Sequence, residues 1–270
     1  MLLTSDVSPL LHKRLSITIQ NNEGFYYLQD GRQHKTGFGT SSTTTVAFVS
    51  CLLIALNRVR CVLDMTLTPS IPPSQDDLKR IASIATQAHQ QAQHKSGSGY
   101  DITTGVYGSC VFEMRRDHTP FSMPAGLSLL LSQGGAKSSS TPELVKRMQS
   151  WRKDASWETY RRNNERLIDA LTMRDCAALH ALFLEKLDVM YAISSASGCA
   201  IVPSELYPVL KETMAIPGVV GCAVAGAGGF DSFYALVDAT CDIKAVEKRW
   251  QRDGYSISTV VEDDCGMTIR

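Results

Sequence analysis

The sequence predicts a mixed α+β fold, because strand-like and helix-like segments follow one another without the steady alternation that builds a parallel sheet. Apolar residues alternate with polar ones at Leu15, Ile17 and Ile19, which is the period of a half-buried strand. Apolar residues recur at helical spacing between Leu78 and Ala92. The chain has 270 residues, 44% of them hydrophobic, which suits one large domain or two small ones with a substantial core.

Composition limits the classes of partner. Lys and Arg together number 27, as do Asp and Glu, so we expect neither nucleic acid nor a membrane surface as a partner. The eight cysteines are scattered without a Cys-x-x-Cys pair, which favours reduced thiols over a disulfide framework or a zinc site. The N-terminus shows no secretory signal, and the apolar run Val46–Leu56 is too short to cross a bilayer. A cytoplasmic protein is therefore expected.

The N-terminal part of the chain predicts a strand pair, a buried helix and a capped helix. Residues 14–28 predict the strand pair, with turn residues 21–24 between the strands. The apolar run Val46–Leu56 is hydrophobic on most sides, which predicts a helix buried in the domain centre. After a proline-rich break, residues 74–77 resemble a capping box and begin a helix that ends before residues 95–99.

The rest of the chain predicts further strands and helices in mixed order. Strands are expected at residues 110–116, 127–131, 219–225, 233–237 and 256–261. Helices are expected from Thr141 onward, twice within residues 157–195, over residues 203–214 and after Asp242.

The stretch Lys35–Thr45 combines two glycines around one apolar residue with six consecutive hydroxyl residues, Thr40 to Thr45. Glycines let a backbone turn sharply, and the N-terminus of a following helix presents free N–H groups to an anion. The stretch therefore predicts a phosphate-binding loop for a nucleotide, although it lacks the Gly-Lys-Ser/Thr ending of a Walker A loop. The alternative interpretation is a turn whose hydroxyls only cap the helix.

Four small-residue loops lie between regular elements, and a run of the expected helix, residues 88–93, precedes the second loop. Residues 35–41 read Lys-Thr-Gly-Phe-Gly-Thr-Ser, residues 88–93 read Ala-His-Gln-Gln-Ala-Gln, and residues 97–101 read Gly-Ser-Gly-Tyr-Asp. Residues 137–141 read Lys-Ser-Ser-Ser-Thr, and residues 226–231 read Gly-Ala-Gly-Gly-Phe-Asp. In this order and spacing, the loops resemble the motifs of the GHMP kinase superfamily, and within it those of the eukaryotic-type phosphomevalonate kinases.

The resemblance implies the GHMP kinase fold, with an N-terminal part like domain 2 of ribosomal protein S5 and a ferredoxin-like C-terminal part. It implies an incomplete ATP-binding domain at residues 1–122 and the C-terminal domain at residues 123–270. The chain departs from the family in lacking the N-terminal Pro-Gly-Lys motif and an internal segment before the phosphate loop. Thr40 replaces the usual serine, and Phe230 replaces the usual glycine.

The resemblance also implies an activity, the Mg²⁺-dependent transfer of the ATP γ-phosphate to 5-phosphomevalonate in isoprenoid and sterol precursor synthesis. It implies a small-molecule substrate as the partner, a monomer or weak homodimer, and a location in the cytoplasm or in a peroxisome-type organelle. Two alternatives stay open at this point. One is a truncated relative that keeps the fold without turnover, and the other is a different GHMP kinase, such as mevalonate kinase.

The resemblance assigns roles residue by residue. The residues expected to bind the ATP phosphates are Gly37, Phe38, Gly39, Thr40, Ser41 and Ser42, with Ser41 nearest the Mg²⁺. Asp101 is the expected catalytic carboxylate, which orients or deprotonates the acceptor, and Lys35 neutralises phosphate charge. The expected substrate-binding residues are Ser98, Gly99, Lys137, Ser138, Ser139, Gly228 and Gly229. The structural alternatives are an Asx-turn cap for Asp101 and solvated surface charges for the lysines.

His89 and Gln93 lie four residues apart in the expected helix, so both side chains occupy one face and point at the same loop. A metal site at His89 would need a second ligand, which the sequence does not supply. A structural hydrogen bond is therefore the expected use of His89.

Overall fold

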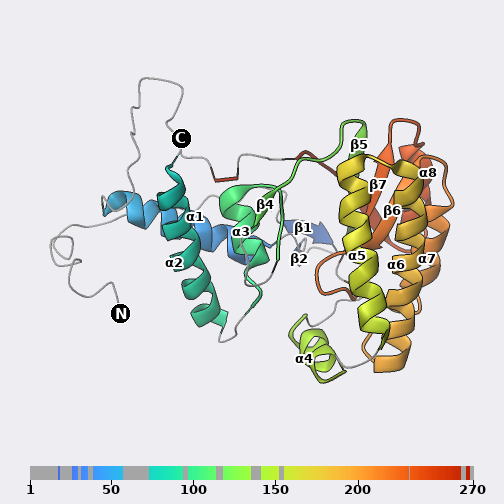
Figure 1. Cartoon of the computed structure of the whole chain (residues 1–270), viewed down its shortest axis with the longest axis horizontal. Coiled ribbons are helices and arrows are strands. Elements are labelled where there is room, and N and C mark those ends of the chain that lie inside the picture. The colour runs from blue at the N-terminus through green and yellow to red at the C-terminus, as the bar shows by residue number, and fades with distance from the viewer. Residues whose placement is uncertain are drawn as a thin grey trace. The chain divides into compact units, whose positions relative to one another are not determined.

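The computed structural model describes residues 18, 26–29, 32–35, 39–56, 73–93, 97–113, 118–134, 141–151, 155–230, 232–262 and 266–267. The chain divides into two compact units (Figure 1). The first unit holds the described residues from 39 to 122 and from 262 onward. The second unit holds residues 123–261 and the described residues between 26 and 37.

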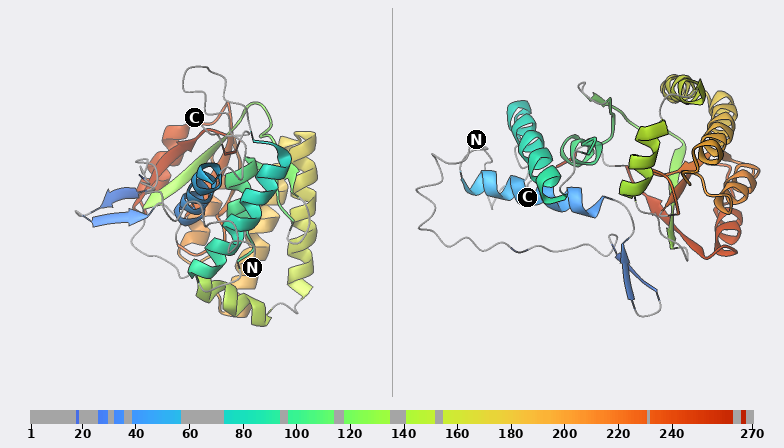
Figure 2. Two further views of the ribbon diagram at one scale, coloured as in Figure 1. Left: turned by 90° about the vertical axis from the view of Figure 1, so that its left-hand side faces the viewer. Right: turned by 90° about the horizontal axis from the view of Figure 1, so that it is seen from below.

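The described part of the first unit is mainly helical. It contains α1 (Thr40–Ala55), α2 (Gln75–Gln93), α3 (Tyr100–Tyr107) and an antiparallel pair, β3 (Cys110–Val111) and β4 (Thr119–Pro120). Helices α2 and α3 both pack against α1 (Figure 2). The buried residues of this small core are Val46, Val49, Leu53, Ile81, Ala85, Ile102 and Val106. The strand expected at residues 110–116 is confirmed only at its first two residues, and residues 114–117 lie outside the described chain.

Helix α1 differs from the expectation of a helix buried on most sides. Val46, Val49 and Leu53 face α2 and α3 and are nearly inaccessible to solvent. Phe48 is 41% exposed and Cys51 is exposed, so the opposite face of α1 meets solvent in the described structure. An apolar composition predicts that a helix is covered, but the cover depends on elements elsewhere in the chain.

Helix α2 begins where the capping pattern predicts. The Ser74 hydroxyl accepts a hydrogen bond from the Asp77 N–H at 3.2 Å and donates one to Asp77 Oδ2 at 2.7 Å. This reciprocal pair satisfies one of the free N–H groups of the first turn. Ile81 and Ala85 then bury the expected apolar face.

The second unit is built on an antiparallel sheet of β5 (Leu127–Gly134), β6 (Val219–Val224), β7 (Phe233–Asp238) and β8 (Tyr255–Val260), in the order β6-β7-β5-β8. Helices α4 (Thr141–Trp151), α5 (Ala155–Met173), α6 (Cys176–Ser197) and α7 (Leu206–Met214) connect β5 to β6. Helix α8 (Ile243–Gln251) connects β7 to β8. This β-α-β-β-α-β order confirms the expected ferredoxin-like C-terminal part.

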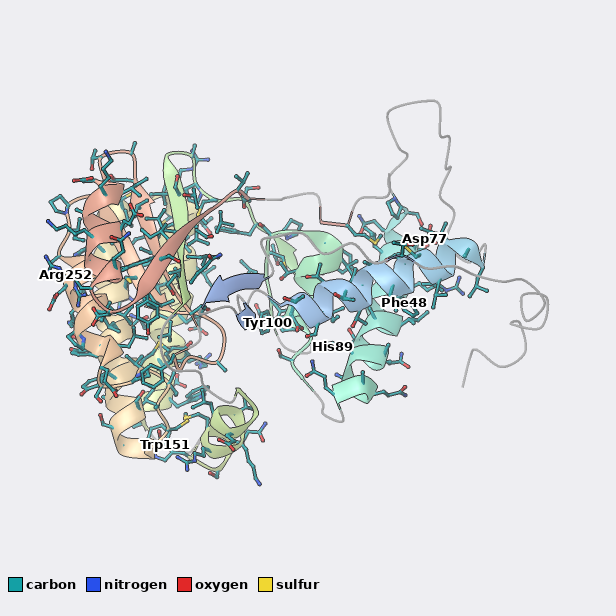
Figure 3. All side chains as sticks on the ribbon, turned by 180° about the vertical axis from the view of Figure 1, so that it is seen from behind. Phe48, Asp77, His89, Tyr100, Trp151 and Arg252 are labelled. Atoms are coloured by element: carbon teal, nitrogen blue, oxygen red, sulfur yellow. The ribbon has the colours of Figure 1, made fainter. Side chains whose placement is uncertain are left out.

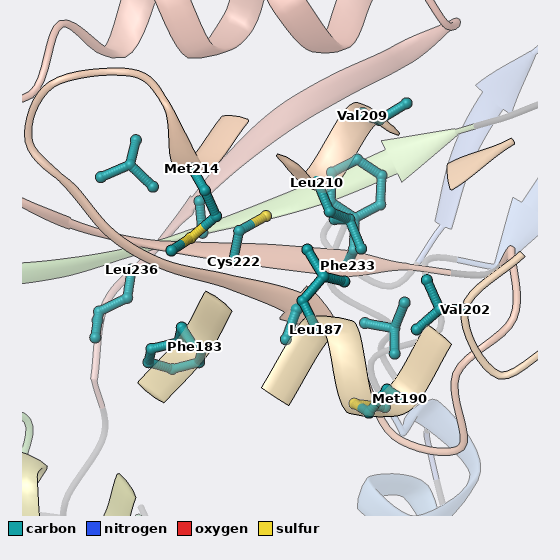
Figure 4. Packing of buried hydrophobic residues seen from close by; sticks show 14 of the residues in the cluster. Phe183, Leu187, Met190, Val202, Val209, Leu210, Met214, Cys222, Phe233 and Leu236 are labelled. Atoms are coloured by element: carbon teal, nitrogen blue, oxygen red, sulfur yellow. The ribbon is translucent and has the colours of Figure 1, made fainter. Parts of the chain in front are cut away.

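Helices cover both faces of the β6–β7 part of the sheet. Consecutive residues of a strand point to opposite faces. In β7, Phe233 makes an edge-to-face contact with Trp250 of α8, whereas its neighbour Tyr234 contacts Phe183 of α6. Figure 4 shows the two layers, with residues of α6 on one side of the strands and residues of α7 on the other. Gly221 lets Phe183 approach the sheet, because a Cβ atom there would lie 2.3 Å from the ring.

A short hairpin precedes the phosphate-binding stretch. β1 (Tyr26–Gln29) and β2 (Arg32–Lys35) pair antiparallel, with Tyr26 opposite Lys35 (Figure 2). The aromatic strand expected at residues 25–28 is thus confirmed with a small shift, whereas β2 was not expected from its polar residues. The strand expected at residues 15–19 lies outside the described residues, apart from Thr18, which is in no strand.

No helix among the described residues is both long enough and apolar enough to span a lipid bilayer.

Candidate functional site

The N-terminus of α1 has the geometry of an anion-binding site. Gly39 is the N-cap residue, its φ of 71° lies in the left-handed region, and no side chain caps the helix. The first backbone bond of the helix runs from Thr43 N–H to the Gly39 carbonyl at 3.0 Å. The N–H groups of Thr40, Ser41 and Ser42 therefore have no partner within the helix and are available to a phosphate.

The six hydroxyls of Thr40–Thr45 are equivalent in the sequence, but the structure distinguishes them by their hydrogen-bond partners. The Ser42 and Thr43 hydroxyls donate to the Gly39 carbonyl at 2.6 and 3.2 Å, and Thr45 donates to the Ser41 carbonyl at 2.8 Å. Ser42 is also buried, with 1% of its surface exposed. Ser41 is exposed, and its hydroxyl turns out of the helix towards α2. Ser41 is therefore the hydroxyl best placed for a bound phosphate or its cation.

Helix α2 supplies the partners of Ser41. His89 Nε2 lies 3.3 Å from Ser41 Oγ, and Gln93 Nε2 lies 3.4 Å from the same oxygen. The two side chains also bond to each other, at 2.9 Å between Gln93 Nε2 and His89 Nε2. The expected common face of His89 and Gln93 is confirmed, and the structure shows that both contact the loop before α1.

The N-terminus of α3 has the same capping geometry as that of α1. Gly99 is the N-cap residue with a φ of 83°, and again no side chain caps the helix. Asp101 lies in the first turn, half-buried, and its Oδ1 accepts a hydrogen bond from Ile102 N–H at 3.0 Å. Burial, and secondly the charge of Asp101, raise the pKa of the neighbouring Tyr100. Within the described chain Oδ2 of Asp101 makes no recorded hydrogen bond, so it is available to a ligand.

One end of α2 holds both glycine loops. His89 and Gln93 contact the loop before α1, and the amide of Gln90 donates to the Gly97 carbonyl of the loop before α3 at 3.4 Å. Figure 3 shows His89 and Tyr100 near one end of α1, whereas Asp77 lies at the other end. The Gln90 contact was not foreseen, although this residue belongs to the Ala-His-Gln-Gln-Ala-Gln run. Side chains of α2 thus contact both loops within the first unit.

The glycine loop of the second unit has a different construction. Gly228 and Gly229 are buried, with φ values of 81° and 91°. A Cβ atom on Gly228 would lie 2.4 Å from the Ile201 carbonyl oxygen. The N–H of Gly229 donates to that same carbonyl at 2.7 Å. These glycines therefore serve the packing of the loop against Ile201, a contact that the sequence does not reveal.

Several expected site residues receive no structural description. Gly37, Phe38, Lys137, Ser138 and Ser139 lie outside the described residues. Lys35 ends β2, and only its backbone pairing is described. Ser98 is exposed beside Gly99 in the loop before α3. Among the described residues, no group of three or more His, Cys, Asp or Glu side chains forms a metal site.

Comparison with curated proteins finds phosphomevalonate kinases. The chain is 26% identical to the enzyme of Aspergillus fumigatus over 293 positions, which cover 87% of this chain and 56% of that one. It is 25% identical to the peroxisomal enzyme of Arabidopsis thaliana over 318 positions, covering 87% and 61%. It is 27% identical to the enzyme of Saccharolobus solfataricus over 269 positions, covering 92% and 72%. No family model matches the chain.

The chain is shorter than these relatives. It spans 56% and 61% of the fungal and plant enzymes. The plant alignment extends over 318 positions, which exceeds the 270 residues of this chain. The plant enzyme therefore has internal segments that this chain lacks.

Solved structures show the same fold. Streptococcus pneumoniae phosphomevalonate kinase in complex with phosphomevalonate and AMPPNP matches with a TM-score of 0.60 and 16% identity, covering 86% of this chain and 71% of that one. L. major mevalonate kinase in complex with R-mevalonate matches with a TM-score of 0.61 and 17% identity, covering 83% of this chain and 66% of that one. The chain has the GHMP kinase fold and is related in sequence to the phosphomevalonate kinases.

Proposed function

We propose that this protein transfers the γ-phosphate of ATP to 5-phosphomevalonate, giving 5-diphosphomevalonate and ADP. The observation that carries the proposal is the attachment of both glycine loops to one end of α2, with the Ser41 hydroxyl at one loop and the Asp101 carboxylate at the other. The sequence similarity to fungal, plant and archaeal phosphomevalonate kinases supports this reaction among those of the GHMP kinases.

ATP binds, in this proposal, at the N-terminus of α1. The free N–H groups of Thr40, Ser41 and Ser42 hold phosphate oxygens, and Gly37, Phe38 and Gly39 form the approach to the helix. The Ser41 hydroxyl contacts the Mg²⁺ that neutralises the phosphate charge. The solved structure of the Streptococcus relative contains AMPPNP, which supports ATP as the phosphate donor.

Asp101 and Lys35 are the proposed catalytic residues. Phosphoryl transfer depends mainly on the alignment of donor and acceptor and on neutralisation of charge. The acceptor already carries an ionised phosphate, so Asp101 acts by orienting it rather than as a strong base. Lys35 provides positive charge beside the transferred group. The proposed substrate-binding residues are Ser98, Gly99, Lys137, Ser138 and Ser139, whereas Gly228 and Gly229 act through the packing of their loop against Ile201.

We also propose the domain organisation, the partners and the location of the protein. Most of residues 1–122 form the proposed ATP-binding domain and most of residues 123–270 the proposed GHMP kinase C-terminal domain, although the described residues between 26 and 37 and those from 262 onward belong to the other compact unit. The protein acts on a small molecule as a monomer or weak homodimer, without nucleic acid or membrane partners. Its proposed location is the cytoplasm or a peroxisome-type organelle, since the related Arabidopsis enzyme is peroxisomal.

A second candidate is a GHMP-fold protein without turnover. The internal segments that the plant relative has and this chain lacks favour this alternative. The two candidates differ in one measurable respect. A kinase releases ADP from Mg-ATP only when phosphomevalonate is present, whereas an inactive relative releases none with either phosphomevalonate or mevalonate.

The test is a coupled ADP-release assay with the purified chain and the Asp101→Asn variant. Asparagine keeps the oxygen that accepts the Ile102 N–H but removes the charge, so the fold is retained while the rate falls by about 10²-fold or more. The matched control is Asp76→Asn, at an exposed acid in the first turn of α2. A wild-type rate at Asp101→Asn would refute the role of this carboxylate. An absence of ADP release by the unmodified chain would refute the kinase proposal itself.

A further inference from the structure

Three side-chain atoms from two helices form a closed triangle at the N-terminus of α1. The edges measure 2.9 Å between Gln93 Nε2 and His89 Nε2, 3.3 Å between His89 Nε2 and Ser41 Oγ, and 3.4 Å between Gln93 Nε2 and Ser41 Oγ. The hydroxyls of Ser42, Thr43 and Thr45 donate hydrogen bonds to the carbonyls of Gly39 and Ser41 at the start of the same helix. Ser41 is thus the hydroxyl whose direction is determined from outside α1.

The hydrogens in this triangle can be assigned by their chemistry. With the Gln93 amide nitrogen towards the triangle, one N–H donates to His89 Nε2 and the other to Ser41 Oγ. Ser41 then keeps its own O–H for a phosphate oxygen. With the amide rotated by half a turn, its oxygen accepts from both His89 and Ser41, and Ser41 presents only lone pairs outward, as a cation requires. In either state the amide decides where the Ser41 hydrogen points.

The packing of the two helices does not depend on these polar contacts. Val46, Val49, Ile81 and Ala85 join α1 to α2 in the buried core. Gln93 is exposed in the last turn of α2 and His89 is only half-buried, so neither side chain fills the core. The hydrogen bond between the exposed Gln93 amide and the Ser41 hydroxyl contributes little to the stability of the fold. The same bond restricts the Ser41 side chain, which would otherwise sample three staggered rotamers.

We propose that His89 and Gln93 are positioning residues that orient the Ser41 hydroxyl towards the nucleotide phosphates and their Mg²⁺. The inference rests on the proposed function, because it assumes that a nucleotide binds at this helix N-terminus. The inference explains why His89 and Gln93 lie four residues apart: this spacing places both side chains on one face of α2, next to the Ser41 hydroxyl.

The test measures nucleotide affinity rather than turnover. The dissociation constant of Mg-AMPPNP is determined by calorimetry for the unmodified chain and for Gln93→Met, His89→Leu and Ser41→Ala. Methionine and leucine keep side-chain volume and remove the hydrogen bonds. Each variant is expected to bind about fivefold more weakly, which corresponds to one lost hydrogen bond. His89→Gln, whose amide replaces the imidazole nitrogen, is expected to recover most of the affinity.

A double-mutant cycle separates positioning from a structural effect. In the Ser41→Ala background, Gln93→Met and His89→Leu are expected to cause no further loss, because both act through the missing hydroxyl. The matched control is Gln91→Met, at an exposed glutamine of the same helix. Melting temperatures of all variants are expected to stay within about 2 °C of the unmodified chain, as surface substitutions do.

The outcomes distinguish the two proposals. Equal losses of affinity with and without the Ser41 hydroxyl would overturn the positioning role while the kinase proposal stands. Unchanged affinity in Gln93→Met and His89→Leu would do the same. An unmodified chain that binds no Mg-AMPPNP would overturn the proposed function and the inference together.

Discussion

The two units use glycine for opposite purposes. In the first unit, Gly39 and Gly99 begin helices whose N-termini no side chain caps, so backbone N–H groups stay available to a ligand. In the second unit, Gly228 has no room for a Cβ atom, and the N–H of Gly229 is already bonded to the Ile201 carbonyl. Similar sequence patterns thus produce an open anion site in one unit and a closed packing contact in the other.

The units also differ in how their cores are completed. The second unit has an extensive core on both faces of its sheet, large enough to accommodate the half-buried Lys186 between α5 and α6. The small core of the first unit is joined by Met267, from the far end of the chain. All three tryptophans, Trp151, Trp157 and Trp250, belong to the second unit. Tryptophan fluorescence therefore reports the unfolding of that unit alone, which allows the comparison to be tested.

The largest expected effect is on the closed loop. In Gly228→Ala the Cβ atom meets the Ile201 carbonyl, a backbone group that cannot rotate away, and the positive φ adds strain. The expected loss of stability is about 4 kcal/mol, measured by urea unfolding followed by tryptophan fluorescence.

The matched control for Gly228 is Gly254→Ala in the same unit. Gly254 has the same φ of 81°, but nothing lies within 4 Å of its Cβ position. Its substitution is expected to cost only the backbone strain, about 1 to 2 kcal/mol. Equal losses at the two positions would show that Gly228 is not a packing residue, and the contrast between the loops would fail.

The second effect is a pH dependence within the core of the second unit. Burial lowers the pKa of Lys186 to about 8 from its ordinary 10.5. The folded protein therefore binds fewer protons than the unfolded chain between these values, so the stability of this unit rises with pH from about 8 to 10.5. Below pH 8 the penalty for charging Lys186 is fully present.

Lys186→Met removes that penalty. The amine otherwise donates to Asn164 Oδ1 at 3.2 Å and lies 5.7 Å from the centre of the Tyr160 ring. At pH 7 the variant is expected to be more stable by about 2 kcal/mol, with the gain shrinking at pH 9 and 10. Urea unfolding at each pH, followed by fluorescence, measures this. The exposed Lys248→Met serves as the control, and a gain for Lys186→Met that is independent of pH would contradict the explanation.

The third effect concerns Gly39 in the open loop before α1, which is compared with Gly228 in the closed loop. In Gly39→Ala the positive φ and a 3.0 Å approach to Ser42 Oγ cost about 1.5 kcal/mol of stability in the first unit. The distortion also moves the N–H groups that bind phosphate, so Mg-AMPPNP affinity is expected to fall about tenfold. Gly126→Ala, with a similar φ and open space, is the control and should leave affinity unchanged. Unchanged affinity in Gly39→Ala would remove the anion site from α1.

The sequence predicts the glycine loops but not their difference. The order of elements, the capped start of α2 and the common face of His89 and Gln93 follow from local spacing. The closed state of Gly228 depends on Ile201, a residue distant in sequence that only the tertiary fold places against it. Likewise, six hydroxyls in a row look equivalent in the sequence, but in the helix Ser42, Thr43 and Thr45 bond back to earlier carbonyls, whereas Ser41 faces α2.

Strand β2 shows a second limit of local patterns. Its residues Arg32–Lys35 are polar and do not alternate with apolar ones, so periodicity gives no strand signal. The strand forms because the backbone pairs with β1, in a register that joins Tyr26 to Lys35. Pairing of backbone groups carries no side-chain signature. For this reason the sequence does not predict a strand at β2.

The smallest expected effect concerns the core of the first unit. The N–H of Met267 donates to the Val106 carbonyl at 3.2 Å, and its sulfur accepts from the Ser50 hydroxyl at 2.7 Å. Met267→Ala removes a partly buried side chain from a small core and is expected to cost about 1 kcal/mol. Hydrogen exchange of peptides from α1 and α3 should accelerate, while the unfolding midpoint reported by tryptophan stays unchanged. Val261→Ala, at a side chain that is 87% exposed, is the control. A shift of the tryptophan midpoint in Met267→Ala would show instead that the two cores unfold as one cooperative unit.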